Sequence, residues 1–369
     1  MQGTMGGVRR KTIYFTAPGK VELGEETLPA LGADEVLVET ICSAISAGTE
    51  MLVYRGEFPQ LQDSQDSFSS DLKYPCPYGY ASAGRIKEIG AEVDRSLLDR
   101  LVFGFQPHAS CFLTSPASLI FAPASFSAET CSFLPNMETA VNLVQDAAPI
   151  LGERVLVMGQ GVIGLLAASL LKEFPLEALV TADPYPLRRK ASLEIGVTDS
   201  FDPEIMRQME KISNTNSQSS SSSKSSFVSS THTNSPPKHS VAYTQKKFDL
   251  TFELSGSPSA LNEAIELTAF SGRIIIGSWY GEKRAEIDLG GDFHRSRIKL
   301  ISSQVSSIAP ELRGRWDKAR RFAVAWEALK RIQPQKWITH RFPIEEADQA
   351  YQLLADNPQD SIQVLFTYS

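Results

Sequence analysis

The fold is decided by one stretch, Glu153-Arg-Val-Leu-Val-Met-Gly-Gln-Gly-Val-Ile-Gly-Leu-Leu-Ala-Ala-Ser-Leu-Leu171. Its apolar run Val155–Met158 has the length of a buried parallel strand. Three glycines follow with GxGxxG spacing, and Leu165–Leu171 has the pattern of a helix. The spacing alone arises by chance, but between a strand and a helix it predicts a turn that binds a dinucleotide.

Each position of this turn has an expected task. Gly159 permits the tight turn, Gly161 lets the backbone approach a pyrophosphate, and Gly164 lets the helix pack closely on the strand. The helix N-terminus at Val162 and Ile163 offers N–H groups to the anion. The competing interpretation is a glycine turn in an α/β protein that binds no nucleotide.

A carboxylate follows the next predicted strand. Asp183 stands at the end of Leu176–Ala182, 19 residues after Gly164. A dinucleotide fold places an acid there to accept hydrogen bonds from the adenosine ribose. The same charge would repel a 2′-phosphate, so NAD is expected in preference to NADP. Arg188 and Arg189 are close enough in sequence to weaken that preference.

Composition and charge argue against several classes of protein. The 369 residues suffice for two domains, and 42% hydrophobic with 21% charged residues is ordinary for a soluble globular protein. A net charge of −7 without a basic stripe argues against nucleic-acid binding. The four cysteines are scattered without a CxxC pair, which predicts reduced thiols and a cytoplasmic location. We expect neither a secretory signal nor a membrane span, because no apolar run approaches about 20 residues.

The first third of the chain is rich in short strands separated by turns. Strands are predicted at Lys11–Phe15, Lys20–Leu23, Glu35–Cys42, Leu101–Phe105 and Cys111–Leu113. Residues 60–72 are predicted to form a polar loop, and a further strand leads to Gly90. Few helices are predicted, so residues 1–126 are expected to form a β-barrel-like domain.

Helices and strands alternate after Ser127, so residues 127–308 are expected to form a Rossmann-type, doubly wound parallel sheet. The further elements are the strands Asp199–Phe201, Phe248–Glu253, Gly272–Gly277 and Lys299–Ser302, and the helices Leu187–Ile195, Glu204–Ile212 and Ser259–Ala269. Residues 213–240 are a serine-rich insertion whose composition predicts disorder. A phosphorylated regulatory loop is the alternative to plain solvated coil.

Residues 309–369 close the chain. Helices are predicted at Arg315–Ile332 and Ile344–Leu354, and a strand at Ile362–Phe366. The basic run Lys318, Arg320 and Arg321 is interpreted as a solvated face, with a site for an acidic substrate group as the alternative.

These segments together resemble the medium-chain dehydrogenase/reductase family over nearly the whole chain apart from the serine-rich insertion. The resemblance is carried by Gly48-Thr-Glu50, Tyr54-Arg-Gly56, Gly79-Tyr-Ala-Ser-Ala-Gly84, Thr139, Gly152-Glu-Arg-Val-Leu-Val157, the three glycines, Asp183, Ser255-Gly256 and Gly272–Gly277. It implies a GroES-like β-barrel catalytic domain that is interrupted by the Rossmann domain and completed by residues 309–369. It also implies a small-molecule substrate and a homodimer formed through the Rossmann domain. The expected nicotinamide neighbours are Thr139, Ser278 and Trp279, and Ser255, Gly256 and Gly277 are further residues expected to bind the cofactor.

The chain departs from the zinc members of that family at their ligand positions. Those members bind catalytic zinc through a cysteine, a histidine–glutamate pair after a glycine, and a later ligand. By the resemblance, the cysteine position falls at Ala47 and the Gly-His-Glu motif reads Gly79-Tyr80-Ala81. Residues 135–138, near the third position, include neither a thiol nor an imidazole. A catalytic zinc needs about three protein ligands, so we expect no zinc.

Within the family, the chain looks like the branch of 2-desacetyl-2-hydroxyethyl bacteriochlorophyllide a dehydrogenases. The segments Ser46–Glu50, Leu134–Ala140 and Ile301–Gln304, and the tyrosine after Gly79, carry this likeness. That branch oxidises a secondary alcohol on a chlorin ring with NAD. The resemblance therefore implies a hydroxyethyl or keto substituent on a bulky apolar substrate.

Without zinc, side chains must stabilise or protonate the substrate oxygen during hydride transfer. Tyr80 is the first candidate, since by the resemblance it occupies a lost ligand position, and a tyrosine with a pKa of about 10 can donate a proton in the reductive direction. Thr49 matches the family's relay hydroxyl, and His108 could complete a proton relay. The competing interpretations are that Tyr80 is a packed aromatic residue, that Thr49 caps a turn, and that His108 is an exposed loop histidine. Glu50 is expected to orient the backbone or a partner.

Three functions remain open on the sequence. The first is a zinc-free NAD(P)-dependent alcohol dehydrogenase or ketone reductase. The second is an enoyl or quinone reductase, against which Asp183 argues because such enzymes generally prefer NADPH. The third is a nucleotide-binding protein without turnover, since a fold does not by itself imply a function.

Overall fold

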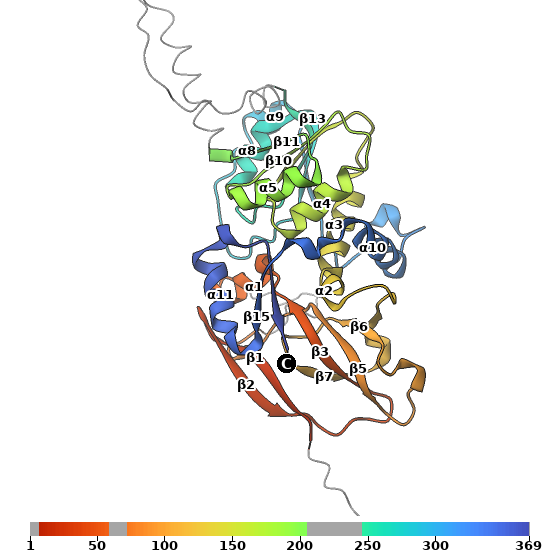
Figure 1. The fold of residues 1–369 in the computed structure, drawn as a ribbon. Helices are drawn as coiled ribbons and strands as arrows, with labels where there is room; N and C mark the ends of the chain where they lie inside the picture. The colour runs from red at the N-terminus through yellow and green to blue at the C-terminus, as the bar shows by residue number, and fades with distance from the viewer. Residues whose placement is uncertain (1–6, 59–71, 205–245, 369) are drawn as a thin grey trace, which may run out of the picture. The chain divides into compact units, whose positions relative to one another are not determined.

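A computed structural model of the protein describes residues 7–58, 72–204 and 246–368 (Figure 1). The chain divides into two compact units. The first comprises Met1–Gln145, Ser278–Ala285 and Gln304–Ser369, and the second Asp146–Gly277 and Glu286–Ser303. Helices α2 (Ala128–Cys131) and α3 (Leu134–Ala147) thus fall almost entirely in the first unit, whereas the expected Rossmann domain began at residue 127. The expected boundaries 1–126, 127–308 and 309–369 stay predictions.

Two β-sheets build the first unit in the part of the chain that is described. The larger has the order β15-β16-β3-β5-β6-β8, with β7 paired to β3. Its strands are β3 (Val36–Ala44), β5 (Ser82–Ile89), β6 (Leu101–Gly104), β7 (Cys111–Thr114), β8 (Ile120–Phe121), β15 (Ile338–Pro343) and β16 (Gln363–Thr367). The smaller sheet consists of β2 (Lys20–Thr27), β1 (Arg9–Ala17) and β4 (Cys76–Pro77). Residues from both ends of the chain therefore share one sheet.

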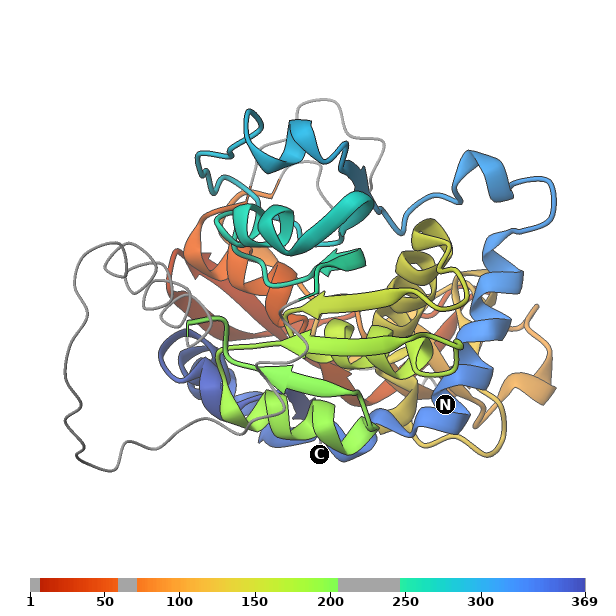
Figure 2. The ribbon, with the colours of Figure 1, turned by 90° about the horizontal axis from the view of Figure 1, so that it is seen from above.

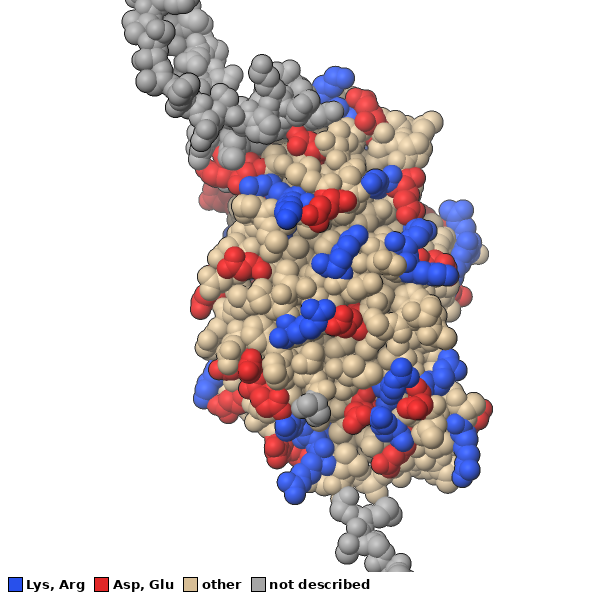
Figure 3. Space-filling view, viewed as in Figure 1, with Lys and Arg blue, Asp and Glu red and all other residues tan. Residues whose placement is uncertain are grey.

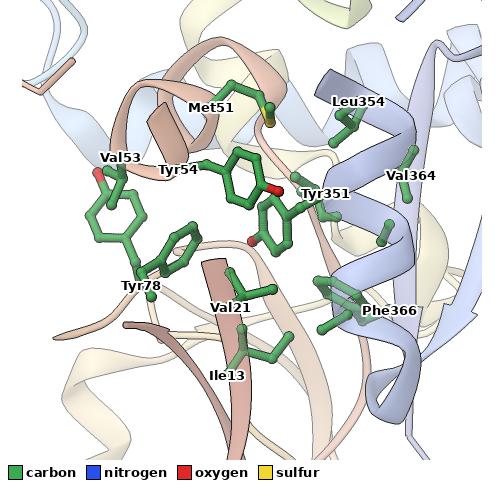
Figure 4. Close-up of a cluster of buried hydrophobic side chains, with 14 of the residues drawn as sticks. Ile13, Val21, Met51, Val53, Tyr54, Tyr78, Tyr351, Leu354, Val364 and Phe366 are labelled. Atoms are coloured by element: carbon green, nitrogen blue, oxygen red, sulfur yellow. The ribbon is translucent and has the colours of Figure 1, made fainter. Parts of the chain in front are cut away.

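Helices α1 (Ala47–Arg55) and α11 (Ala347–Asp356) close one core of this unit (Figure 4). The Tyr54 ring of α1 stacks on the Tyr351 ring of α11, with centroids 5.5 Å apart and planes 14° apart. Helix α1 ends at Gly56, whose φ of 71° lets its N–H reach the carbonyls of Leu52 and Val53. Burying these aromatic side chains fixes both helices against the strands.

A parallel sheet forms the second unit, with the order β11-β10-β9-β12-β13-β14 among the described residues (Figure 2). The strands are β9 (Arg154–Met158), β10 (Ala178–Ala182), β11 (Asp199–Phe201), β12 (Phe248–Glu253), β13 (Thr268–Ile276) and β14 (Lys299–Ser302). Numbered along the chain, this is the doubly wound order 3-2-1-4-5-6. The expected α/β architecture, with a Rossmann sheet and a separate β-sheet unit, is confirmed.

Helices cover both faces of this parallel sheet. On one face, Leu261 and Ile265 of α8 (Ala260–Leu267) pack in a cluster with Leu156 and Val180. On the other face lie α4 (Val162–Leu171) and α5 (Pro186–Ile195). The Ser192 hydroxyl of α5 is hydrogen-bonded at 2.8 Å to Thr181, whose side chain points away from that of Val180 because strand residues alternate.

Several sequence predictions need correction in their extent. Helix α1 and strand β15 were not predicted. Helix α8 ends at Leu267, because β13 begins at Thr268 rather than at Gly272. Helix α10 (Lys318–Ile332) begins three residues later than predicted, since the Asp317 side chain accepts from the Arg320 N–H and sets the helix start. The predicted loop 60–72 lies almost wholly outside the described residues. So do most of helix 204–212 and all of insertion 213–240.

The interpretation of the basic run on α10 is wrong for one of its members. Arg320 is exposed and Lys318 is half-exposed, as a solvated face requires. Arg321 is completely buried, and its guanidinium donates to Glu138 and Asn142 of α3. The charge pattern of a helix does not show which of its cations will face a buried acid, because that acid lies in a distant segment of the sequence.

On the face drawn in Figure 3, Lys and Arg alternate with Asp and Glu among the described residues. The described part of this face shows no continuous basic patch, and the absence of nucleic-acid binding stays a prediction from the net charge of −7. Within the described ranges, no helix is long and apolar enough to cross a bilayer.

Candidate functional site

The glycine turn of the second unit joins the end of β9 to the start of α4. Gly159 has a φ of 90°, in the region that favours glycine. A Cβ added there would lie 2.4 Å from the carbonyl oxygen of Leu254, at the end of β12. The turn therefore sits where the strand order reverses between β9 and β12, which is where doubly wound sheets bind ligands.

Gly161 and Gly164 have opposite surroundings. A Cβ at Gly161 would meet nothing within 4 Å, whereas one at Gly164 would lie 1.9 Å from the carbonyl oxygen of Gly159. Gly161 is the N-cap of α4, so the N–H groups of Val162 and Ile163 have no partner within the helix. Open space beside a helix N-terminus fits a dinucleotide pyrophosphate, and the tight packing at Gly164 fixes the helix against the turn.

Asp183, directly after β10, is almost fully buried, with 2% of its surface exposed. Its Oδ2 accepts from the Gln160 N–H at 2.7 Å and its Oδ1 from the Tyr185 N–H at 2.8 Å. Burial raises the pKa of this carboxyl group, and the Arg188 guanidinium opposes the rise. A carboxylate has about four acceptor sites, so two remain. Its bond to a ribose stays a prediction.

The two arginines of α5 differ in their surroundings. Arg188 lies 4.0 Å from Asp183 Oδ2 and covers the Tyr185 ring, 4.8 Å from its centroid. Arg189 Nη1 donates to the Asp183 carbonyl at 2.7 Å and to Asp202 Oδ2 at 3.1 Å. Arg188 is thus the cation next to the carboxylate, and it is the residue that could tolerate a 2′-phosphate.

Other predicted cofactor residues lie at the carboxyl ends of β12 and β13. The Ser255 N–H donates to the buried Glu253 carboxylate at 2.8 Å, and the Gly277 N–H donates to the Glu253 carbonyl at 3.1 Å. Gly256 follows with a φ of 72° and open space around its Cβ direction. These residues share one edge of the sheet with Gly159, because parallel strands end on the same side.

Two predicted nicotinamide neighbours, Thr139 and Ser278, fall in the first unit. The Thr139 hydroxyl donates to the Pro135 carbonyl at 2.9 Å within α3. Their contact with a cofactor stays a prediction.

Gln160, between the first two glycines of the motif, was not among the predicted site residues. It is completely buried, and its amide nitrogen donates to the carbonyls of Val157 and Gly159 at 3.2 and 3.0 Å. Its side-chain oxygen accepts from Ser192 of α5 at 3.1 Å. The sequence signal available for it was a polar residue flanked by two glycines.

In the first unit, Tyr80 precedes β5 and is half-buried. Its hydroxyl donates to the Ser46 hydroxyl and lies 3.4 Å from Thr49 Oγ1. Burial raises the pKa of Tyr80, the two hydroxyl contacts lower it, and the Glu50 charge raises it. The structure thus brings together two of the three predicted catalytic residues and adds Ser46 as a missed partner.

His108 is completely buried, so its interpretation as an exposed loop histidine is wrong. The loop is pinned by its backbone, because the His108 N–H donates to the Tyr78 carbonyl and the His108 carbonyl accepts from Ile13 of β1. The imidazole packs on Gly79, where a Cβ would lie 2.6 Å from the ring and where φ is 115°. Only glycine fits at that position.

Glu50, on α1, is also completely buried and has three partners. One carboxylate oxygen accepts from the Ser46 N–H at 2.8 Å, and the other from the Tyr351 hydroxyl at 2.6 Å. His108 Nε2 lies 3.0 Å from the latter oxygen. Such contacts suit the orienting role expected for Glu50, and no sequence signal marked Tyr351 as its partner.

At the positions where the resemblance implies zinc ligands, the first unit carries neither a cysteine nor a histidine, and the absence of zinc stays a prediction. Ala47 begins α1, Tyr80 and Ala81 precede β5, and Pro135 lies in α3, and the alanines and the proline offer no metal-binding side chain. In the ranges that the structure describes, no group of three or more His, Cys, Asp and Glu side chains could hold a metal ion.

The parallel sheet, the glycine turn and the separate β-sheet unit define a two-unit α/β protein with a dinucleotide-type fold. No protein-family model matches the sequence. The zinc-type alcohol dehydrogenase-like protein YphC of Escherichia coli K12 is 21% identical over 387 residues, covering 96% of this chain and 98% of YphC. L-idonate 5-dehydrogenase (NAD(P)(+)) from the same strain is 24% identical over 377 residues, covering 99% and 91%.

Solved structures share the fold. The short chain alcohol dehydrogenase RspB of Escherichia coli CFT073, complexed with NADH, matches with a TM-score of 0.71 at 19% sequence identity, covering 98% of this chain and 100% of that chain. These similarities, at 19–24% identity, support the expected resemblance to zinc-type alcohol dehydrogenase-like proteins.

Proposed function

We propose that this protein is a zinc-independent, NAD(P)-dependent oxidoreductase that interconverts a secondary alcohol and a ketone on a bulky apolar substrate. The relatives support the coarser statement, an alcohol or polyol dehydrogenase-like oxidoreductase that uses NAD(P). The observation that carries the finer proposal is Tyr80, whose hydroxyl contacts Ser46 and Thr49 at a position where the resemblance implies a zinc ligand.

The second unit would hold the cofactor. Gly159, Gly161 and Gly164 supply the turn and the open space for a pyrophosphate, and Asp183 favours NAD over NADP through its negative charge. Arg188, 4.0 Å from that charge, limits the preference. When bound, the reduced cofactor supplies a hydride to the substrate carbon.

Tyr80 would donate or accept the proton that accompanies hydride transfer. In the reductive direction its hydroxyl protonates the ketone oxygen, and in the oxidative direction the phenolate removes the proton of the alcohol. His108 is completely buried, so it cannot contact substrate and is reassigned from a catalytic to a supporting residue. Thr49 remains half-buried beside Tyr80 and can reach the same oxygen.

The substrate to test first is a chlorin that carries a hydroxyethyl or acetyl group. Its choice rests on the resemblance to the bacteriochlorophyllide dehydrogenase branch. Simple secondary alcohols and polyols form the comparison set, because L-idonate 5-dehydrogenase is among the relatives. We also propose a homodimer through the Rossmann unit and a cytoplasmic location.

The variant Tyr80→Phe tests this function. We expect turnover to fall by about 10²–10⁴-fold, the usual contribution of a proton donor, with unchanged NADH affinity. Tyr14→Phe is the matched control, since Tyr14 is a half-buried tyrosine of the same unit whose hydroxyl contacts Glu26 instead. Turnover by nicotinamide absorbance and NADH affinity by calorimetry are the measurements.

Four results would count against parts of the proposal. Unchanged turnover of Tyr80→Phe removes Tyr80 as the donor. Zinc in stoichiometric amount in the purified, active enzyme removes the metal-independent mechanism. Reduction of enones or quinones, with secondary alcohols and ketones inert, favours the enoyl or quinone reductase instead, and a hundredfold preference for NADPH overturns the role given to Asp183.

A further inference from the structure

Buried polar side chains of the first unit form a connected chain of hydrogen bonds. The Ser43 hydroxyl lies 2.6 Å from the Tyr368 hydroxyl and 2.6 Å from His108 Nδ1. His108 Nε2 lies 3.0 Å from Glu50 Oε2, which also accepts from the Tyr351 hydroxyl. These hydrogen bonds thus link Tyr368, directly after β16, and Tyr351 of α11 to Glu50 of α1.

Glu50 sets the direction of the hydrogen bonds. A carboxylate only accepts, so with His108 as a neutral imidazole the contacts are satisfied when its Nε2–H donates to Glu50 and its Nδ1 accepts a hydrogen bond from the Ser43 hydroxyl. The Ser43 oxygen then accepts from Tyr368. Every member has a partner in this arrangement, which is the condition under which a buried polar network is rigid.

Ser43, His108 and Glu50 are also the residue types of a hydrolytic triad. All three side chains are completely buried, and the Ser43 hydroxyl already contacts Tyr368. No substrate carbonyl can reach that serine, so the network organises its neighbours and does not act as a nucleophile.

The second oxygen of Glu50 leads from this network to Tyr80. Glu50 Oε1 accepts from the Ser46 N–H at 2.8 Å, four residues earlier in the chain. The Ser46 side chain contacts the Tyr80 hydroxyl, and Thr49 Oγ1 lies 3.4 Å from the same oxygen. Because a hydroxyl group can donate or accept, both can turn to donate to Tyr80 once its proton has left.

We propose that Glu50 is the positioning residue of Tyr80: its buried carboxylate, anchored by His108 and Tyr351, fixes Ser46, and Ser46 with Thr49 stabilises the phenolate that remains after proton transfer. The inference rests on the proposed function, in which the Tyr80 proton moves to the ketone oxygen. Tyr80 is half-buried, so the phenolate can regain its proton from water.

Glu50 then acts on Tyr80 in two opposite ways. Its negative charge raises the pKa of Tyr80 directly, whereas the Ser46 contact that it fixes lowers that pKa, both against a background of burial that raises it. A variant that removes the charge of Glu50 but keeps its shape therefore raises or lowers the pKa of Tyr80, depending on which of the two effects is larger.

The test is a tyrosinate titration of the full-length chain, with Tyr80 isolated by difference from Tyr80→Phe. If Glu50 positions Ser46, Glu50→Gln raises the Tyr80 pKa by about one unit, the scale of one hydrogen bond to a charged group. We expect Ser46→Ala to raise the Tyr80 pKa by a similar amount, and Ser46→Thr, which retains the hydroxyl, to leave that pKa at its original value. The double variant Glu50→Gln with Ser46→Ala should show the same Tyr80 pKa as either single variant. Tyr14→Phe leaves the Tyr80 transition unchanged.

A fall in the Tyr80 pKa in Glu50→Gln overturns the proposal, because the direct effect of the Glu50 charge alone predicts a fall. The proposal is also overturned if the pKa shifts of the two single variants add in the double variant. Should Glu50→Gln fail to fold, Tyr351→Phe removes one anchor without a charge change. We expect a smaller upward shift from it, and no shift overturns the proposal. The titration needs neither substrate nor cofactor, so its outcome is separate from the loss of turnover that tests the proposed function.

Discussion

Gly161 and Gly164 lie three residues apart in the same turn, yet a side chain at each would meet opposite surroundings. The Cβ direction of Gly161 is open, and that of Gly164 points at the Gly159 carbonyl. One glycine is therefore needed only for what binds beside it, and the other for the fold itself.

The two positions can be separated by substitution. We expect Gly161→Val to cost about 1 kcal/mol or less in unfolding free energy, the scale of a changed N-cap, and to weaken NADH binding at least about tenfold, or 1.4 kcal/mol. Gly164→Ala should destabilise the protein by about 3 kcal/mol or more, since its Cβ overlaps a carbonyl oxygen. Urea unfolding and calorimetric titration measure the two effects. Undiminished NADH binding by Gly161→Val would exclude this turn as the pyrophosphate site.

Residue-scale chemistry was predictable only in part. The GxGxxG turn and Asp183 could be identified because their positions are fixed by short sequence spacings. Tyr80 and Thr49 could be proposed from the resemblance, and they lie within hydrogen-bonding distance of each other. The burial of Glu50 and His108 could not be predicted, since it depends on Tyr351 and other residues far along the chain.

At the scale of elements, one buried guanidinium joins α10 to α3. Arg321 donates to Glu138 Oε1 through Nε at 3.0 Å and through Nη2 at 2.7 Å, and to Asn142 Oδ1 at 2.6 Å. It also donates to the backbone carbonyls of Val305 and Ser307. The segment that contains Val305 and Ser307 is thereby held to the same guanidinium that joins the two helices.

Arg321→Met should leave Glu138 buried without this partner, and we expect a loss of about 3–5 kcal/mol in unfolding free energy. Lys318→Met is the matched control on the same helix. Lys318 is half-exposed and 3.6 Å from Glu138, so its loss should cost less than about 1 kcal/mol. Denaturant unfolding measures both variants. Equal effects of the two substitutions would contradict a dominant role for the buried pair.

At the scale of the whole molecule, β11 ends at Phe201 and β12 begins at Phe248, on either side of residues 213–240. The serine-rich composition of that segment predicts an insertion that is not needed for the sheet. Plain solvated coil and a phosphorylated regulatory loop are the two alternatives for this segment.

Replacing residues 213–240 with a short Gly/Ser linker should therefore change the unfolding free energy by about 1 kcal/mol or less, because closure entropy varies by about 0.6 kcal/mol per doubling of loop length. NADH affinity should stay unchanged. Thermal unfolding and calorimetric titration of the shortened chain give both values, and a chain that no longer binds NADH would show that the segment contributes to the second unit.

The family resemblance implied that strands from both ends of the chain share one domain, whereas the sequence by itself determined the doubly wound sheet and the glycine turn. Those features depend on local periodicity and on spacings of a few residues, which a linear pattern contains. Only the tertiary structure decided which polar groups are buried together. Glu50 meets Tyr351 across 301 residues and Arg321 meets Glu138 across 183. A buried charge is stable only with such partners, and chain folding alone brings them within reach.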